Sequence, residues 1–205
     1  MDLPATNVDQ PATDSGPARD LRTASLRGQF AYLRILGPED YPALRAAEMT
    51  EEIGPRWRHR AATPGPEEWV RTLWNSVLAQ FLIIESSTDR PVGLVTAYNA
   101  DFQDRHVALA ATRLAPASRA PIVMFGLALF LRYVFLNWDF RKIYLEVPEF
   151  NLFQFSSILN RYATVEGCLK QHRFAGGEWW DQYVLAIYRE VWENQGSGLL
   201  GGRST

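Results

Sequence analysis

Apolar and polar side chains alternate, or recur at helical spacing, over residues 29–193, which is the pattern of one folded domain. The sequence FAYLRILG, at 30–37, alternates and predicts a strand. Residues 38–49 begin with a proline and carry apolar residues at helical intervals, which predicts a short helix. Residues 66–80 place large apolar side chains on one helical face and predict a second helix.

The middle of the chain is dominated by apolar runs of strand length. Residues 81–87 and 91–100 are two such runs, and the turn residues between them predict a hairpin. A third run, 106–116, follows. We therefore expect three consecutive strands in this region.

The most apolar segment, 121–138, predicts a buried helix. Its uninterrupted apolar run ends at Arg132, well short of the ~20 residues that span a bilayer. A strand is expected at 141–148. With strand 106–116 and the helix, it would form a right-handed parallel crossover.

The last third of the domain predicts a helix over 151–162 and then a hairpin. The hairpin strands are expected at 165–174 and 178–192, around Ala175-Gly176-Gly177. The whole order is typical of an α/β protein. It predicts a mixed central β-sheet of about seven strands with helices on both faces.

Both ends of the chain lack this periodicity. Residues 1–28 are rich in Pro, Ala, Thr, Asp and Ser and predict a disordered leader; residues 194–205 predict a flexible tail. The leader has neither a basic segment nor an apolar one, so we do not expect it to be a signal peptide. We expect a cytoplasmic protein that does not associate with a membrane.

Net charge and amino-acid composition argue against several classes of function. The formal net charge is −2, which argues against nucleic-acid binding through bulk positive charge. Cys168 is the single cysteine, so no intrachain disulfide can form, and a Cys/His zinc site is close to excluded. No metal is expected. Only Lys142 and Lys170 are lysines, which makes Schiff-base chemistry a poor fit.

Several features have two interpretations. The run Arg56-Trp57-Arg58-His59-Arg60 could bind an acidic substrate or phosphate, although a solvated loop is the favoured interpretation. Glu51 and Glu52 could bind a cationic amine or serve solubility. Trp179 and Trp180 point to opposite faces of one strand, so one of them could line a channel or an interface. The surplus of aromatic residues is compatible with a homodimer.

A set of short motifs recurs in a fixed order over the second half of the domain. They are Tyr133-Val134-Phe135, Lys142-Ile143-Tyr144-Leu145-Glu146-Val147, Asn151, Glu166-Gly167 and Gly177-Glu178-Trp179-Trp180-Asp181. In this order and spacing the chain resembles the GNAT superfamily of N-acetyltransferases, in its RimJ/RimL-like branch. The resemblance covers about 29–193.

The resemblance implies acetyl-coenzyme A as co-substrate and an amine of a small molecule or of a protein N-terminus as acceptor. The pantetheine arm would pair like an extra strand with Thr112, Arg113 and Leu114, and Asn151 would form the far wall. The pyrophosphate would lie at the N-terminus of the following helix. The residues implied there are Ser118, Arg119, Ala120, Ile122 and Val123.

The chain departs from the family in that pyrophosphate loop. Its glycines are absent from 118–123, and Pro121 removes one backbone donor. The positive charge of Arg119 or Arg113 would compensate. The departure leaves two alternatives open: a binding or assembly module that has lost the coenzyme A site, or an enzyme with a different acyl donor, such as one bound to a carrier protein.

The expected catalytic groups also depart from the family. Many relatives use a tyrosine to protonate the departing thiolate, and Ile158 occupies the matching position here. Tyr162 and Ser157 are the nearest hydroxyls that could replace it, with Ser156 beside them. A general acid or base contributes about 10²–10⁴-fold to such a reaction. We expect direct transfer without a covalent enzyme intermediate.

Overall fold

Seven strands form one mixed sheet in the order β1-β2-β3-β4-β5-β7-β6. The computed structural model describes residues 26–51, 53–114, 120–156, 158–159, 161–196 and 200. The strands are β1 (Ala31–Ile35), β2 (Val77–Glu85), β3 (Arg90–Asp101), β4 (His106–Arg113), β5 (Lys142–Pro148), β6 (Thr164–Ala175) and β7 (Glu178–Tyr188). Neighbouring strands are antiparallel except β4 and β5, which are parallel.

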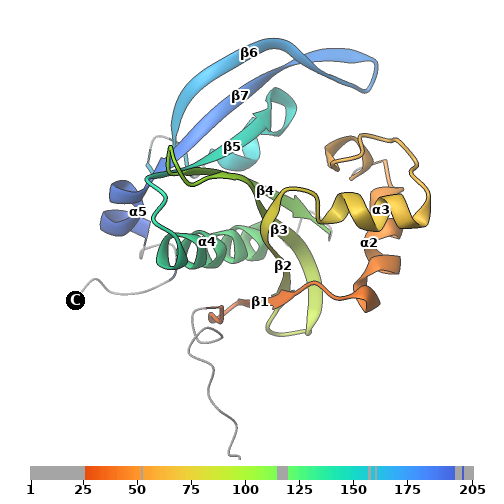
Figure 1. Ribbon diagram of the computed structural model, residues 1–205, viewed down its shortest axis with the longest axis horizontal. Helices are drawn as coiled ribbons and strands as arrows, with labels where there is room; N and C mark the ends of the chain where they lie inside the picture. Colours follow the sequence, from red (N-terminus) through yellow and green to blue (C-terminus); the bar gives the residue numbers. More distant parts are fainter. Residues whose placement is uncertain are drawn as a thin grey trace, which may run out of the picture.

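Helices cover both faces of this sheet. One face carries α4 (Ala120–Asn137), and the other carries α2 (Tyr41–Glu48) and α3 (Pro66–Leu73). Figure 1 shows the strands running from β6 at the top to β1 below, with α2 and α3 at one end of the sheet and α5 (Arg189–Gln195) at the other. The predicted α/β fold, a seven-stranded mixed sheet with helices on both faces, is confirmed.

Strand β2 illustrates how both faces of the sheet are buried. Phe81 and Ile83 pack in the core under α4, whereas Leu82 and Ile84 pack in the core under α2 and α3. Successive strand residues point to opposite faces, so the run 81–84, covered on both sides, is apolar at each of its four positions. Each such side chain contributes roughly 1.5–3 kcal/mol on burial.

The central helix α4 packs directly across β1 to β4. It is long and apolar enough to cross a membrane by length and composition, as the core helix of a globular protein also is. A Cβ at Gly126 would lie 2.4 Å from Cγ2 of Ile83. The glycine therefore lets the helix backbone approach β2 more closely than any side chain would allow.

The predicted helix over 66–80 is too long. α3 ends at Leu73, Ser76 has a left-handed φ of 56°, and β2 begins at Val77. Val77 and Leu78 fit the apolar stripe of a helix and also the inner positions of a strand. Val77 pairs with Tyr98 of β3, so it begins strand β2 and does not extend the helix.

The predicted helix over 151–162 is also wrong, because this segment does not form an α-helix. A 3₁₀ helix, η4, spans Glu149–Phe155 and is followed by turns. Leu152 and Phe155 pack against the core on the α4 side. The segment is held by hydrogen bonds of short span, such as Ser156 N–H to the carbonyl of Phe153 at 3.2 Å.

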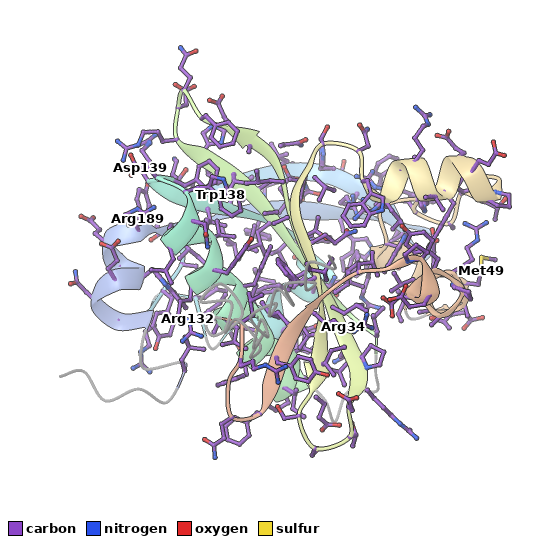
Figure 2. All side chains as sticks on the ribbon, turned by 60° about the horizontal axis from the view of Figure 1, so that its bottom comes forward. Arg34, Met49, Arg132, Trp138, Asp139 and Arg189 are labelled. Carbon is purple, nitrogen blue, oxygen red and sulfur yellow. The ribbon has the colours of Figure 1, made fainter. Side chains whose placement is uncertain are left out.

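The last strand ends earlier than predicted, at Tyr188, and α5 occupies residues that we expected in the strand. Arg189 anchors the start of α5: its guanidinium donates to the carbonyl oxygens of Phe135 at 2.9 Å, Trp138 at 2.5 Å and Phe140 at 2.8 Å. Figure 2 shows Arg189 beside Trp138 at the end of α4. A cation at these unpaired carbonyls stabilises the helix C-terminus.

The limits of the predicted domain shift slightly. Leu26, inside the predicted leader, is 8% exposed, and its carbonyl accepts from the N–H of Leu33 at 2.8 Å. At the other end, α5 continues to Gln195, two residues beyond the predicted boundary. Residues 1–25, 197–199 and 201–205 of the predicted leader and tail lie outside the described residues.

Candidate functional site

The parallel pair β4 and β5 separates partway along its length. The strands are in register from His106 and Lys142 to Leu109 and Leu145, and they pair no further. β4 nevertheless continues to Arg113, hydrogen-bonded to β3 on its other side. The edge of β4 that faces β5 is thus not used by the sheet over 110–113, and its backbone groups can pair with an extended ligand.

A groove occupies this opening. It has a volume of about 140 Å³ and is bordered by the ends of both strands and by η4. Three of the predicted residues come together here: Thr112 and Arg113 on the β4 side, and Asn151 on η4. Arg56 Nε donates to Asn151 Oδ1 at 2.9 Å, which fixes the far wall. We name this space the β4/β5 groove.

A second, larger cavity of about 380 Å³ lies next to the groove. Its walls come from residues 56–60, α3, β3 and the β6–β7 hairpin. We name it the arginine cavity, after four of its lining residues. The groove and the arginine cavity have these lining residues in common: Arg56, Ala110, Thr112, Glu146 and Arg173. Two ligands in the two spaces would therefore meet at a common wall.

Glu146 lies on that wall, one residue beyond the last pair of the parallel ladder. Its side chain is exposed, and Gln182 Nε2 donates to its Oε2 at 3.2 Å. A carboxylate between two ligand spaces can bind an ammonium group and accept a proton from it. In the sequence, Glu146 stands out only as a residue of the family motif, because no local pattern distinguishes it from an ordinary strand residue.

Tyr98 of β3 lines the arginine cavity from the sheet. Burial raises the pKa of Tyr98, and the negative charge of Glu146 raises it further. The hydroxyl therefore stays protonated at neutral pH and is a hydrogen-bond donor within the cavity. Sequence reasoning missed Tyr98, since it is one aromatic residue in an apolar strand.

The loop at 56–60 is docked against α3, while Arg56, Arg58 and Arg60 stay exposed, in agreement with the favoured interpretation of a solvated loop. Arg58 Nη1 donates to the carbonyl oxygens of Thr72 and Leu73, both at 2.8 Å, and its Nη2 donates to Gln80 Oε1 at 2.9 Å. His59 contacts Glu48 Oε1 at 2.6 Å. These contacts fix the loop so that its arginines line the cavity.

The residues predicted at the pyrophosphate are only partly described. Ser118 and Arg119 lie outside the described residues. Ala120 begins α4, and Ile122 lies half-buried near its start. Val123 is 7% exposed and packs in the core. Leu114 packs against the core under α2 and α3.

A third cavity, of about 590 Å³, runs beside the first half of α4. We name it the α4 cavity. Its wall is apolar and includes Ala120, Ile122, Phe125 and Tyr162. Tyr162 is 3% exposed and borders neither the groove nor the arginine cavity. The other predicted hydroxyl, Ser157, lies outside the described residues.

The sequence matches no protein-family model, and a search of curated proteins also finds no match. Solved structures do match. A GCN5-related N-acetyltransferase from Brucella melitensis aligns with a TM-score of 0.67 and 18% identity, over 86% of this chain and 83% of that one. A GNAT-family acetyltransferase from Bacillus anthracis aligns at 0.63 and 18%, over 80% and 98%.

A third match is spermidine N-acetyltransferase from Vibrio cholerae, solved in complex with CoA and spermine. Its TM-score is 0.63 at 17% identity, over 80% of this chain and 98% of that one. At such identities the similarity establishes the fold. The protein has the fold of the GNAT-family acetyltransferases.

Proposed function

We propose that the protein is an acyl-CoA-dependent N-acyltransferase that transfers an acetyl group directly from acetyl-CoA to an amine. One observation carries the proposal: the β4/β5 groove and the arginine cavity share a wall on which Glu146 presents a carboxylate. This arrangement allows donor and acceptor to bind at the same time, with the acceptor amine next to a group that can take its proton.

The groove fits the donor in the part that the structure describes. Acetyl-CoA would supply an activated thioester. The unpaired edge of β4 over 110–113 would hydrogen-bond the amides of its pantetheine arm, as an added strand does. Asn151, held by Arg56, would close the other side. We keep Ser118, Arg119, Ala120, Ile122 and Val123 as the proposed pyrophosphate-binding residues, in line with the RimJ/RimL-like resemblance.

The proposal assigns the removal of the amine proton to a group on the common wall. Transfer forms a C–N bond and breaks a C–S bond, and the amine must lose a proton while the thiolate gains one. Glu146 would accept the amine proton, directly or through a water, and the departing thiolate would take a proton from water. Tyr98, protonated at neutral pH, would donate a hydrogen bond on the acceptor side. Tyr162 and Ser157 stay predictions from sequence.

A binding module without a coenzyme A site is the second candidate, and the α4 cavity favours it. Its apolar wall includes Pro121 at the helix start, where a diphosphate requires polar donors. Met124 and Phe125 line the same cavity beside Pro121, and neither of them lines the β4/β5 groove. Phe125 instead packs edge-on against Phe30, with ring centroids 5.4 Å apart.

Isothermal titration of acetyl-CoA into the full chain separates the two candidates. The enzyme proposal predicts saturable binding of one acetyl-CoA per chain and a rise in Tm with ligand concentration. Glu146→Gln should retain that binding while it loses turnover. No heat and no thermal shift at millimolar acetyl-CoA would reject the enzyme proposal and support the module.

A further inference from the structure

The arginine cavity carries an excess of positive charge. The side chains of Arg56, Arg58, Arg60 and Arg173 line it, and among the described lining residues Glu146 is the one carboxylate. The arginines come from two distant parts of the chain, the loop after α2 and strand β6. The fold thus brings several cations to a cavity large enough for a small metabolite.

Arg60 and Arg173 have no carboxylate partner within the described part of the chain. Ion pairs of described arginines include those of Arg34, Arg45, Arg71, Arg105 and Arg189, and neither Arg60 nor Arg173 is among them. Burial lowers the pKa of Arg173, and the charge of Arg60 lowers it further, while Glu146 acts in the opposite direction. Two cations that face each other in a cavity favour an anion between them.

Trp57 gives a second, independent indication of a ligand. Its side chain lines the cavity and is only 2% exposed. Its Nε1 is buried and has no hydrogen-bond partner among the residues that the structure describes. A buried donor without an acceptor is unfavourable, so an indole that turned its N–H toward a ligand oxygen in the cavity would gain a hydrogen bond.

We propose that the acceptor is a small amine that also carries an anionic group, a carboxylate or a phosphate, bound by Arg60, Arg173 and the indole N–H of Trp57. This inference rests on the proposed function and names its substrate class. The ammonium end would face Glu146 on the wall shared with the groove. A volume of about 380 Å³ suits a molecule of the size of an amino acid or an amino-sugar phosphate.

The same charge argues against polyamines as acceptors. The matched enzyme from Vibrio cholerae is named for spermidine. A polyamine carries several positive charges, and Arg60 and Arg173, which have no carboxylate partner among the described residues, would repel it. Similar folds can therefore serve acceptors of opposite charge, because the acceptor site depends on side chains and not on the sheet.

Matched acceptors test the proposal with the full chain and acetyl-CoA. The panel pairs amino acids with their C-terminal amides, glucosamine 6-phosphate with glucosamine, and adds spermidine and a peptide with an acidic N-terminal sequence. We expect kcat/KM to fall about ten- to hundredfold when the anion is removed. The pair of acceptors with the larger fall in kcat/KM shows whether the anionic group that the protein recognises is a carboxylate or a phosphate. Equal use of charged and neutral partners, or preference for spermidine or the peptide, would overturn the proposal.

Charge variants sharpen the test. Arg173→Gln and Arg60→Gln should raise KM for the anionic acceptor about tenfold or more, and Arg173→Glu should shift preference toward the neutral partner. Arg71→Gln is the matched control, because Arg71 is exposed on α3 and pairs with Glu68 at 2.7 Å. Circular dichroism and Tm verify folding. An Arg173→Glu variant that folds and keeps the wild-type preference would contradict the proposal.

The outcomes also separate this inference from the proposed function. If acetyl-CoA neither binds nor donates its acetyl group, the proposed function fails first. If acetyl-CoA binds and neutral or cationic amines are acetylated as well as anionic ones, the function stands and the anionic acceptor is rejected. Acetylation confined to acceptors with a carboxylate or phosphate supports both.

Discussion

The arginine cavity and the α4 cavity lie on opposite faces of the same sheet and differ in chemistry. The α4 cavity is the larger, at about 590 Å³ against about 380 Å³, yet its wall is apolar. The arginine cavity brings together four arginines, Glu146 and Tyr98. If the active site were assigned by cavity volume alone, it would be the α4 cavity. Polar groups converge at the point where β4 and β5 separate, and this criterion identifies the arginine cavity as the candidate active site.

The difference indicates that the α4 face of the sheet serves stability, whereas the face under α2 and α3 serves ligand binding. The face under α4 contains the larger core, in which Leu129, Phe130 and Val134 are completely buried. The face under α2 and α3 has a smaller core, and the space beyond it is available to a ligand. Changes on the α4 side should therefore alter stability, and changes on the arginine side should alter turnover.

The largest effect is expected for Glu146→Gln. Loss of the carboxylate that borders both ligand spaces should lower kcat about 10²–10⁴-fold, since a general base contributes that much. Acetyl-CoA affinity and Tm should stay near wild type. Steady-state kinetics with titration calorimetry measure both, and Glu67→Gln at the exposed start of α3 is the control. A fully active Glu146→Gln would place the chemistry elsewhere.

Gly126→Ala tests the other face. The added methyl group would overlap Ile83 at 2.4 Å and push α4 away from β2. We expect a loss of about 1–3 kcal/mol in the free energy of unfolding, measured by urea denaturation, with kcat of the folded protein almost unchanged. Gly167→Ala, whose Cβ would meet Val184 Cβ at 4.0 Å, should be close to neutral. Equal effects of the two substitutions would refute the close packing of α4.

Two tyrosines distinguish the two cavities directly. Tyr98→Phe removes the hydroxyl from the arginine cavity and should reduce kcat/KM about three- to tenfold, the value of one hydrogen bond. Tyr162→Phe removes a hydroxyl at the α4 cavity and should change kcat/KM less than about twofold. The same kinetic assay serves both variants. The reverse order of effects would support the sequence-based assignment of Tyr162 as the acid.

The smallest effect concerns an ion pair away from the three cavities. Lys142 Nζ lies 2.8 Å from Glu166 Oε2, and Tyr188 also donates to Glu166. Burial alone would raise the pKa of Glu166, but the hydrogen bonds from Lys142 and Tyr188 outweigh it and hold that pKa below its ordinary value.

A lowered carboxyl pKa stabilises the protein above the ordinary value of 4.5, and the contribution is lost as pH falls through the folded-state pKa. Glu166→Gln should therefore cost about 0.5–1 kcal/mol at neutral pH. The difference from wild type should shrink below about pH 4.5 in urea titrations. Glu178→Gln at the hairpin tip is the control, and a difference that grows with acidity would contradict this account.

Most of the fold was predictable because hydrophobic periodicity reports burial. The central strands and the long helix were found where apolar residues form long runs between turn residues, as in β3 and α4. Errors arose where a local pattern fits two structures. Val77 and Leu78 continue a helical stripe, and only pairing with β3 shows that they begin a strand. The start of α5 depends on Arg189, whose carbonyl partners are about 50 residues away in sequence.

The candidate site was less predictable, because its residues converge only in three dimensions. Thr112, Arg113 and Asn151 were found through the family resemblance, and they meet in the groove. Tyr98 and Arg173 carry no local signal, since each is one residue in a strand. The arginines at 56–60 were noticed as a charged run, but their docking against α3 could not be read from their spacing.

The central claim is that donor and acceptor bind together on either side of a common wall. The most direct measurement is the initial rate at varied concentrations of both acetyl-CoA and an amino-acid acceptor. The account predicts double-reciprocal lines that intersect, as simultaneous binding requires. Parallel lines, which indicate an acetylated enzyme intermediate, would contradict it.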